Sequence, residues 1–147
     1  EHELPDGEHH ILAFLSRSYH ESIKTDKAYK AIKATVQDNG FRNVSKIEEP
    51  MLFYSRPKGL YEGNDAKRVM LDYYMVNCDQ SKHSVKAEIN GQEFTLDQWK
   101  PYYIEGLPAG ENEIKLTLID KEGNPVITPL NPVNRKFKIN PEPDVNM

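Results

Sequence analysis

The sequence predicts an all-β protein: an immunoglobulin-like or fibronectin-like β-sandwich preceded by the terminal strands of a second sandwich. Three observations lead to this prediction. Apolar and polar residues alternate in several short segments, and turn-forming residues separate these segments at short intervals. In addition, a turn followed by a strand occurs twice, near the N-terminus and again after residue 107.

Alternation with period two is clearest in residues 85–89. Val85, Ala87 and Ile89 alternate there with polar residues, which is typical of a half-buried strand. The dipeptide Asn90-Gly91 follows, and it favours the positive φ angles of a tight hairpin turn. We therefore expect a returning strand next. The same alternation predicts further strands in residues 94–97, 113–118 and 136–139.

Residues 69–76 predict a strand of a different kind, because both of its faces are apolar. Such a strand is expected at the centre of a sheet and covered on both sides. Together with its neighbours it gives roughly seven strands between residues 48 and 140, the size of an immunoglobulin-like domain. The single cysteine, Cys78, excludes the Cys-Trp-Cys pattern of antibody domains but not their architecture.

The N-terminal part predicts fewer elements. Residues 9–19 form a strand candidate with apolar residues on both faces. Residues 27–36 fit both helical and strand spacing, and their Ala and Lys content favours a helix. We favour a strand that begins at Ala31, with one helical turn before it as an open alternative.

A turn-plus-strand motif links the two parts of the chain. Residues 4–11 (LPDGEHHI) and 107–114 (LPAGENEI) share Leu, Pro, Gly, Glu and Ile in register. We infer that residues 1–47 are the last two strands of a truncated first sandwich and that residues 48–140 form the second. Two strands cannot bury an apolar face alone, so another part of the chain or another protein is expected to cover them. The alternative is one irregular sandwich with two similar turns.

Composition limits the function classes. The chain has 147 residues with 19 Lys and Arg against 23 Asp and Glu, a formal net charge of −4. This balance argues against a nucleic-acid binder, and no apolar run reaches the roughly 20 residues of a membrane-spanning helix. Residues 141–147 contain two prolines and little that could pack, so we expect a disordered tail.

Three segments carry a resemblance to a known family. They are residues 7–22 (GEHHILAFLSRSYHES), 49–59 (EPMLFYSRPKG) and 101–107 (PYYIEGL). In these segments the chain resembles a little-characterised family of envelope lipoproteins of Bacteroidota. The resemblance implies tandem immunoglobulin-like sandwiches, a signal peptide and a lipid-anchored cysteine upstream, and a location in the periplasm or at the outer membrane. It supplies no catalytic residues.

Candidate chemistry is weak, and we expect no enzyme activity, no cofactor and no metal. His9, His10 and His20 are metal candidates, but none of their spacings places two of them on one ion. Cys78 follows an apolar strand and is expected to be an inert thiol. Asp72 interrupts an apolar strand, and a structural hydrogen bond is the safer interpretation of it than a catalytic role.

Aromatic and basic residues form the predicted binding site. Trp99, Tyr102 and Tyr103 cluster around a proline and could stack on sugars or anchor a partner. Arg56 and Lys58 begin a modest basic patch that could meet an anionic ligand. The alternatives are that Trp99 and one tyrosine plug the sandwich core and that the basic residues form a solvated face.

These observations predict a non-catalytic envelope protein. We expect a binding or structural module, an accessory subunit or scaffold that holds other envelope proteins in an outer-membrane or periplasmic assembly. The exposed strand edges of an incomplete first domain motivate this hypothesis. The alternative is recognition of a small ligand, a carbohydrate first, through the Trp and Tyr cluster.

Overall fold

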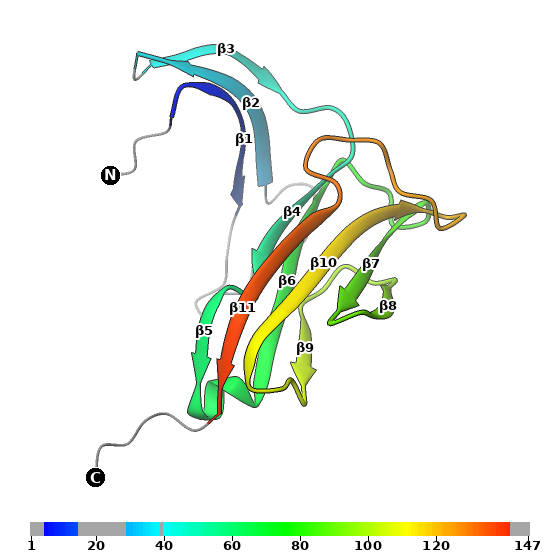
Figure 1. The fold of residues 1–147 in the computed structure, drawn as a ribbon. Helices are drawn as coiled ribbons and strands as arrows, with labels where there is room; N and C mark the ends of the chain where they lie inside the picture. The colour runs from blue at the N-terminus through cyan, green and yellow to red at the C-terminus, as the bar shows by residue number, and fades with distance from the viewer. Residues whose placement is uncertain (1–4, 15–28, 39, 142–147) are drawn as a thin grey trace. The chain divides into compact units, whose positions relative to one another are not determined.

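The computed structural model describes residues 5–14, 29–38 and 40–141, which form two compact units, Glu1–Glu49 and Pro50–Met147 (Figure 1). The predicted all-β class is confirmed, because these residues form strands and one short 3-10 turn, Gly63–Ala66. No helix in this part of the chain has the length and apolar composition needed to cross a bilayer. Residues 15–19 of the first strand candidate, His20 and the predicted tail from residue 142 onward lie outside the described residues.

The first unit contains one antiparallel sheet of three strands in the order β1-β2-β3. The strands are β1 (Gly7–Phe14), β2 (Tyr29–Gln37) and β3 (Gly40–Lys46). The helical alternative is wrong for residues 29–36, since β2 is extended from Tyr29 and residues 29–36 pair with β1, while residues 27 and 28 lie outside the described residues. The expected number of two strands is also wrong. β3 has no clean alternation, and it becomes a strand because its backbone pairs with β2.

The second unit is a sandwich of two sheets. The strand orders are β4-β6-β9 in one sheet and β5-β11-β10-β7-β8 in the other. In both sheets, strands that are not consecutive in the chain pair with each other. This strand order is typical of an immunoglobulin-like or fibronectin-like sandwich and confirms the predicted fold. Its strands are β4 (Met51–Arg56), β5 (Gly59–Glu62), β6 (Arg68–Val76), β7 (His83–Ile89), β8 (Gln92–Leu96), β9 (Tyr102–Glu105), β10 (Gly110–Asp120) and β11 (Val133–Asn140).

The predicted hairpin connects β7 and β8. Asn90 and Gly91 have φ angles of 50° and 89°, and Ile89 pairs directly with Gln92. β5 is one of the strands of the second unit that sequence reasoning did not place, together with β4 and β9. It has four residues and pairs in parallel with β11 in the sheet opposite β4, so the chain changes sheets between β4 and β5.

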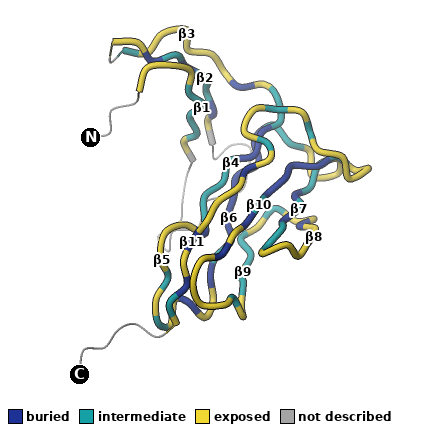
Figure 2. The backbone as a smooth tube through the Cα atoms, in the orientation of Figure 1, coloured by how far each residue is buried: buried dark blue, intermediate teal, exposed yellow. Residues whose placement is uncertain are grey.

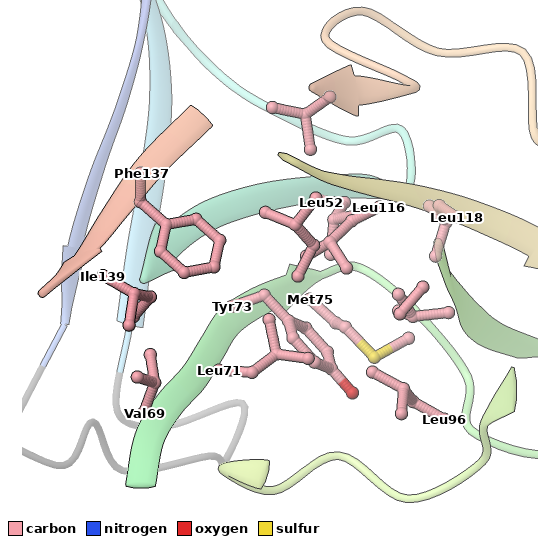
Figure 3. Close-up of a cluster of buried hydrophobic side chains, with 14 of the residues drawn as sticks. Leu52, Val69, Leu71, Tyr73, Met75, Leu96, Leu116, Leu118, Phe137 and Ile139 are labelled. Atoms are coloured by element: carbon pink, nitrogen blue, oxygen red, sulfur yellow. The ribbon is translucent and has the colours of Figure 1, made fainter. Parts of the chain in front are cut away.

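Inward side chains of both sheets form one core (Figure 3). β6 contributes Leu71, Tyr73 and Met75, and β10 contributes Leu116 and Leu118. The prediction that residues 69–76 form a central, covered strand is confirmed. β6 lies between β4 and β9, and its residues from Leu71 to Val76 are all buried (Figure 2).

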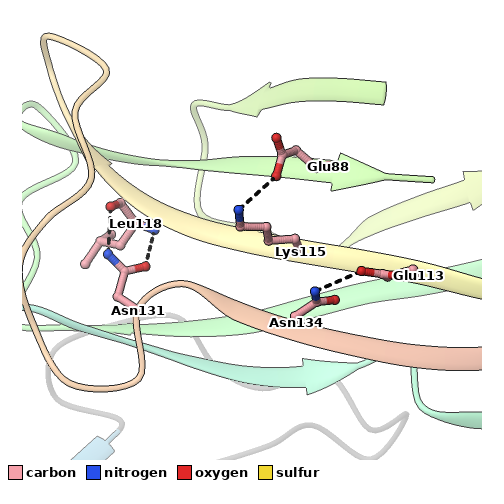
Figure 4. Close-up of polar contacts among 6 residues, drawn as sticks. All are labelled: Glu88, Glu113, Lys115, Leu118, Asn131 and Asn134. Atoms are coloured by element: carbon pink, nitrogen blue, oxygen red, sulfur yellow. Dashed lines mark hydrogen bonds and ion pairs between the residues drawn. The ribbon is translucent and has the colours of Figure 1, made fainter. Parts of the chain in front are cut away.

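An amide side chain in the segment between β10 and β11 bonds to the end of β10, beside the backbone hydrogen bond from the Val126 N–H to the Leu118 carbonyl (Figure 4). The Asn131 side chain accepts a hydrogen bond from the Leu118 N–H at 2.8 Å and donates to the Leu118 carbonyl at 3.0 Å. It also donates to the Val126 carbonyl at 2.7 Å. The amide therefore substitutes for a neighbouring strand at the end of β10.

We predict that Asn131→Ala lowers the free energy of unfolding by about 2–3 kcal/mol, because it removes three half-buried hydrogen bonds of about 1 kcal/mol each. Urea unfolding followed by circular dichroism measures the change. Asn134→Ala is the matched control. Its exposed side chain makes one hydrogen bond, to Glu113, and should cost less than about 1 kcal/mol. Equal costs for the two variants would contradict the assignment.

Candidate functional site

Trp99, in the loop between β8 and β9, is half-buried. Its indole N–H donates to the Tyr73 carbonyl at 3.3 Å, and its ring meets the Tyr74 ring edge-to-face with centroids 4.8 Å apart. These contacts engage the polar end of the indole and its ring system. They favour the interpretation that Trp99 packs against the sandwich core. They do not favour the interpretation that its ring forms an exposed surface for a ligand.

Tyr102 also points toward the core and is half-buried. Its hydroxyl donates to the Gln98 carbonyl at 2.9 Å, and partial burial raises the pKa of that hydroxyl. Tyr103 is the next residue of β9 and is 43% exposed. The Arg68 guanidinium lies 4.1 Å from the centroid of the Tyr103 ring and 3.9 Å from a Glu105 oxygen. Of the three aromatic residues, Tyr103 is therefore the most accessible.

The predicted basic residues lie apart from the aromatic group. Arg56 is the last residue of β4 and pairs across the sheet with Asp72, whereas β9 lies on the other side of β6. Lys58 is exposed in the turn before β5, where its backbone N–H donates to the Tyr61 hydroxyl at 3.0 Å. In the described sheets, β9, which carries Tyr102 and Tyr103, pairs with neither β4 nor β5. A single site that joins all five residues stays a prediction.

His9 and Cys78 have local hydrogen-bond partners, and His10 does not. His9 Nε2 lies 2.7 Å from the Pro5 carbonyl oxygen, whereas the buried His10 Nε2 makes no hydrogen bond and lies 3.9 Å from a Glu8 oxygen. Within the described residues, no group of three metal-ligating side chains comes together. The Cys78 thiol donates to the Val76 carbonyl at 3.3 Å, and burial raises its pKa to about 12. The buried Asp72 carboxylate accepts the N–H of the next residue of its own strand, Tyr73, at 3.0 Å.

Sequence reasoning missed a groove between β4 and β11. The groove has a volume of about 260 Å³, and the chain segments 52–54, 130 and 132–135 line it. Arg135 has the same spacing as the buried residues Val133 and Phe137, but its own side chain is exposed. A charged residue at the spacing of a buried series is a signal that the sequence contained. It was missed because we read the alternation of this strand only from residue 136 onward.

An exposed apolar pair on β3 is the second surface that sequence reasoning missed. Phe41 and Val44 are 58% and 56% exposed, and nearly all of β3 is exposed (Figure 2). Phe41 pairs directly with Val36 of β2, which is buried. The apolar face of this sheet is therefore covered at β2 and open at β3.

Comparisons with known proteins add little to this geometry. No protein-family model and no curated protein matches the sequence. Among solved structures, the chain is similar to one described as fibronectin(III)-like modules of Clostridium thermocellum CbhA, with a TM-score of 0.47 and 14% identity. The match covers 61% of this chain and 97% of that chain. The fold assignment rests on the strand order, and the lipoprotein family has no support from the comparisons.

We predict that Trp99→Ala lowers the free energy of unfolding by about 2 kcal/mol or more, because it removes a half-buried ring and its hydrogen bond. Tyr103→Ala should change it by less than about 1 kcal/mol, since this ring is exposed. Urea unfolding followed by circular dichroism compares the two variants. If Trp99→Ala were neutral, Trp99 would be a surface platform instead.

We predict that Cys78 in the folded chain reacts slowly with iodoacetamide at pH 8. A pKa of about 12 leaves on the order of a thousandfold less thiolate than the usual value near 9. Mass spectrometry of the alkylated protein measures the rate, with the urea-unfolded chain as the control. Similar rates in the two states would show that the thiol is accessible and ionised.

Proposed function

We propose that this protein is a non-catalytic binding module that holds another polypeptide by strand addition to β3. In this proposal it acts as an accessory subunit or scaffold in a periplasmic or outer-membrane assembly and is anchored by a lipid attached upstream of these residues. The observation that carries the proposal is the exposed edge of the β1-β2-β3 sheet. The resemblance of residues 7–22, 49–59 and 101–107 to envelope lipoproteins supports the location.

The backbone of β3 supports strand addition. β3 is the last strand in the sheet order β1-β2-β3, and among the described residues it pairs with β2 alone. An edge strand carries main-chain donors and acceptors that a partner strand can use. The pairing with β2 shifts between Lys33 and Thr35, where Asn43 has a φ of 50°. This bulge limits the most regular part of the edge to a short stretch, which favours a specific partner over open-ended aggregation.

The side chains of β3 suggest the chemistry of the partner. The exposed Phe41 and Val44 offer apolar contact area. Arg42 and Lys46 are the charged residues of β3, and both are basic. A partner strand that carries acidic residues next to apolar ones would therefore complement this edge.

Carbohydrate recognition is the alternative hypothesis, and the contacts of the aromatic residues favour it less. Stacking on sugars needs an open ring face. Trp99 and Tyr102 are half-buried and bonded to backbone carbonyls, which leaves Tyr103 as the accessible ring. One ring beside Arg68 is a smaller platform than the cluster that the sequence predicted.

We predict that a photo-crosslinking phenylalanine analogue at position 41 captures one defined protein in cells that make the full-length protein. The same analogue at Leu60, which is 54% exposed on β5, should not capture it. Phe41→Asp should weaken the association at least tenfold, about 1.4 kcal/mol, because it removes apolar contact at the edge. Gel mobility and mass spectrometry of the adducts test this. No adduct at position 41, or the same adduct from both positions, would overturn the proposal.

A further inference from the structure

A second open strand edge lies in the sandwich, at the beginning of β11. β5 pairs with residues 137–140 of β11, and residues 133–136 extend beyond it. On that side, residues 133–136 have no partner strand among the described residues. Their main-chain donors and acceptors are therefore available to an additional extended segment. Such a segment would pair with β11 on the same side as β5.

The groove beside this edge has a mixed lining, in which polar and apolar atoms contribute similar surface. Leu52 and Val133 form part of its buried lining, and Leu130 is 52% exposed at its rim. A volume of about 260 Å³ can accept apolar side chains from one short segment but not a drug-sized ligand, which needs about 300 Å³ or more. The size of the groove therefore suits a peptide lying along the edge.

Arg135 adds an exposed charge to this groove. Its guanidinium lies 5.6 Å from the centroid of the Tyr54 ring, and Nη1 donates to the Asn134 carbonyl at 3.0 Å. No carboxylate of the described residues forms an ion pair with it. Guanidinium groups bind carboxylates through paired charge-assisted hydrogen bonds, so this cation is a ready partner for an acidic side chain.

The same arginine also determines which strands can add. An exposed charge at an open edge discourages pairing with neutral or basic strands, because the added strand would bury it without a partner. An acidic strand removes that penalty by forming the ion pair. Arg135 therefore discourages pairing with neutral or basic strands and favours pairing with acidic strands.

We propose that this groove binds an extended acidic peptide segment, which adds as a strand beside residues 133–136 of β11. A carboxylate of the peptide pairs with Arg135, and apolar side chains two residues away on the same face enter the groove, as strand geometry requires. This surface is separate from β3, so the inference does not depend on the function proposed above.

The probe is the blocked peptide acetyl-Val-Thr-Glu-Thr-Val-amide, which places its glutamate and valines on one face. Titration into the isotope-labelled full chain, followed by amide NMR shifts, should show changes centred on residues 130–136. The analogue with lysine in place of glutamate should bind at least tenfold more weakly. Arg135→Glu should weaken binding of the glutamate peptide at least tenfold and remove the preference for it over the lysine peptide. Arg68→Glu, at another exposed arginine of the same unit, should leave both affinities unchanged.

A second variant separates the apolar contact from the charge. Leu130 has a φ of 65°, a conformation that asparagine adopts more readily than leucine, so Leu130→Asn should fold at least as well. Leu130→Asn should weaken binding of the glutamate peptide at least threefold. Equal binding of the two peptides, unchanged binding by Arg135→Glu, or shifts centred on β3 would each overturn the inference. A concentration-dependent dimer that Arg135→Glu abolishes would also overturn it, because the occupant would then be a second copy of the chain.

Discussion

Burial of one apolar core between two sheets is the constraint on which the sandwich depends. Inward residues of β6, such as Tyr73, and of β10, such as Leu116, belong to one buried cluster (Figure 3). Because successive side chains of a strand point to opposite faces, a shift of one residue in β10 would turn Lys115 inward and Leu116 outward. The core therefore determines the register. The outer face carries pairs such as Lys115 with Glu88, 3.6 Å apart (Figure 4).

With the apolar faces buried in the core, the strand edges still carry main-chain N–H and C=O groups that another strand can bind. Helices cover no edge in the described residues, so the strands themselves must limit unwanted pairing. β3 carries a bulge and Lys46, and the first half of β11 carries Arg135. These features restrict which strand can pair with each edge, but they leave the edge open to pairing. Both proposals follow from this property, and they concern different units of the chain.

The candidate site was only partly predictable. Trp99, Tyr102 and Tyr103 are close in sequence, which suggested one aromatic surface. Alternation along β9 instead turns Tyr102 toward the core and leaves Tyr103 exposed, and the backbone carbonyl of Tyr73 engages the Trp99 indole. A pattern of residue types cannot show which carbonyl lies within 3.3 Å of an indole N–H, because that carbonyl belongs to a strand 26 residues away.

The sequence by itself determined the all-β class, the Asn90-Gly91 hairpin and the central position of β6, because alternation and turn preferences are local and survive without tertiary contacts. Only the tertiary structure decided three other features. β3 is a strand because β2 offers it a partner, and β5 crosses to the opposite sheet because β11 has an open edge there. Arg135 lies in a groove because β4 and β11 belong to different sheets. Each of these depends on which distant segments meet, and pairing between distant segments leaves little trace in the local pattern.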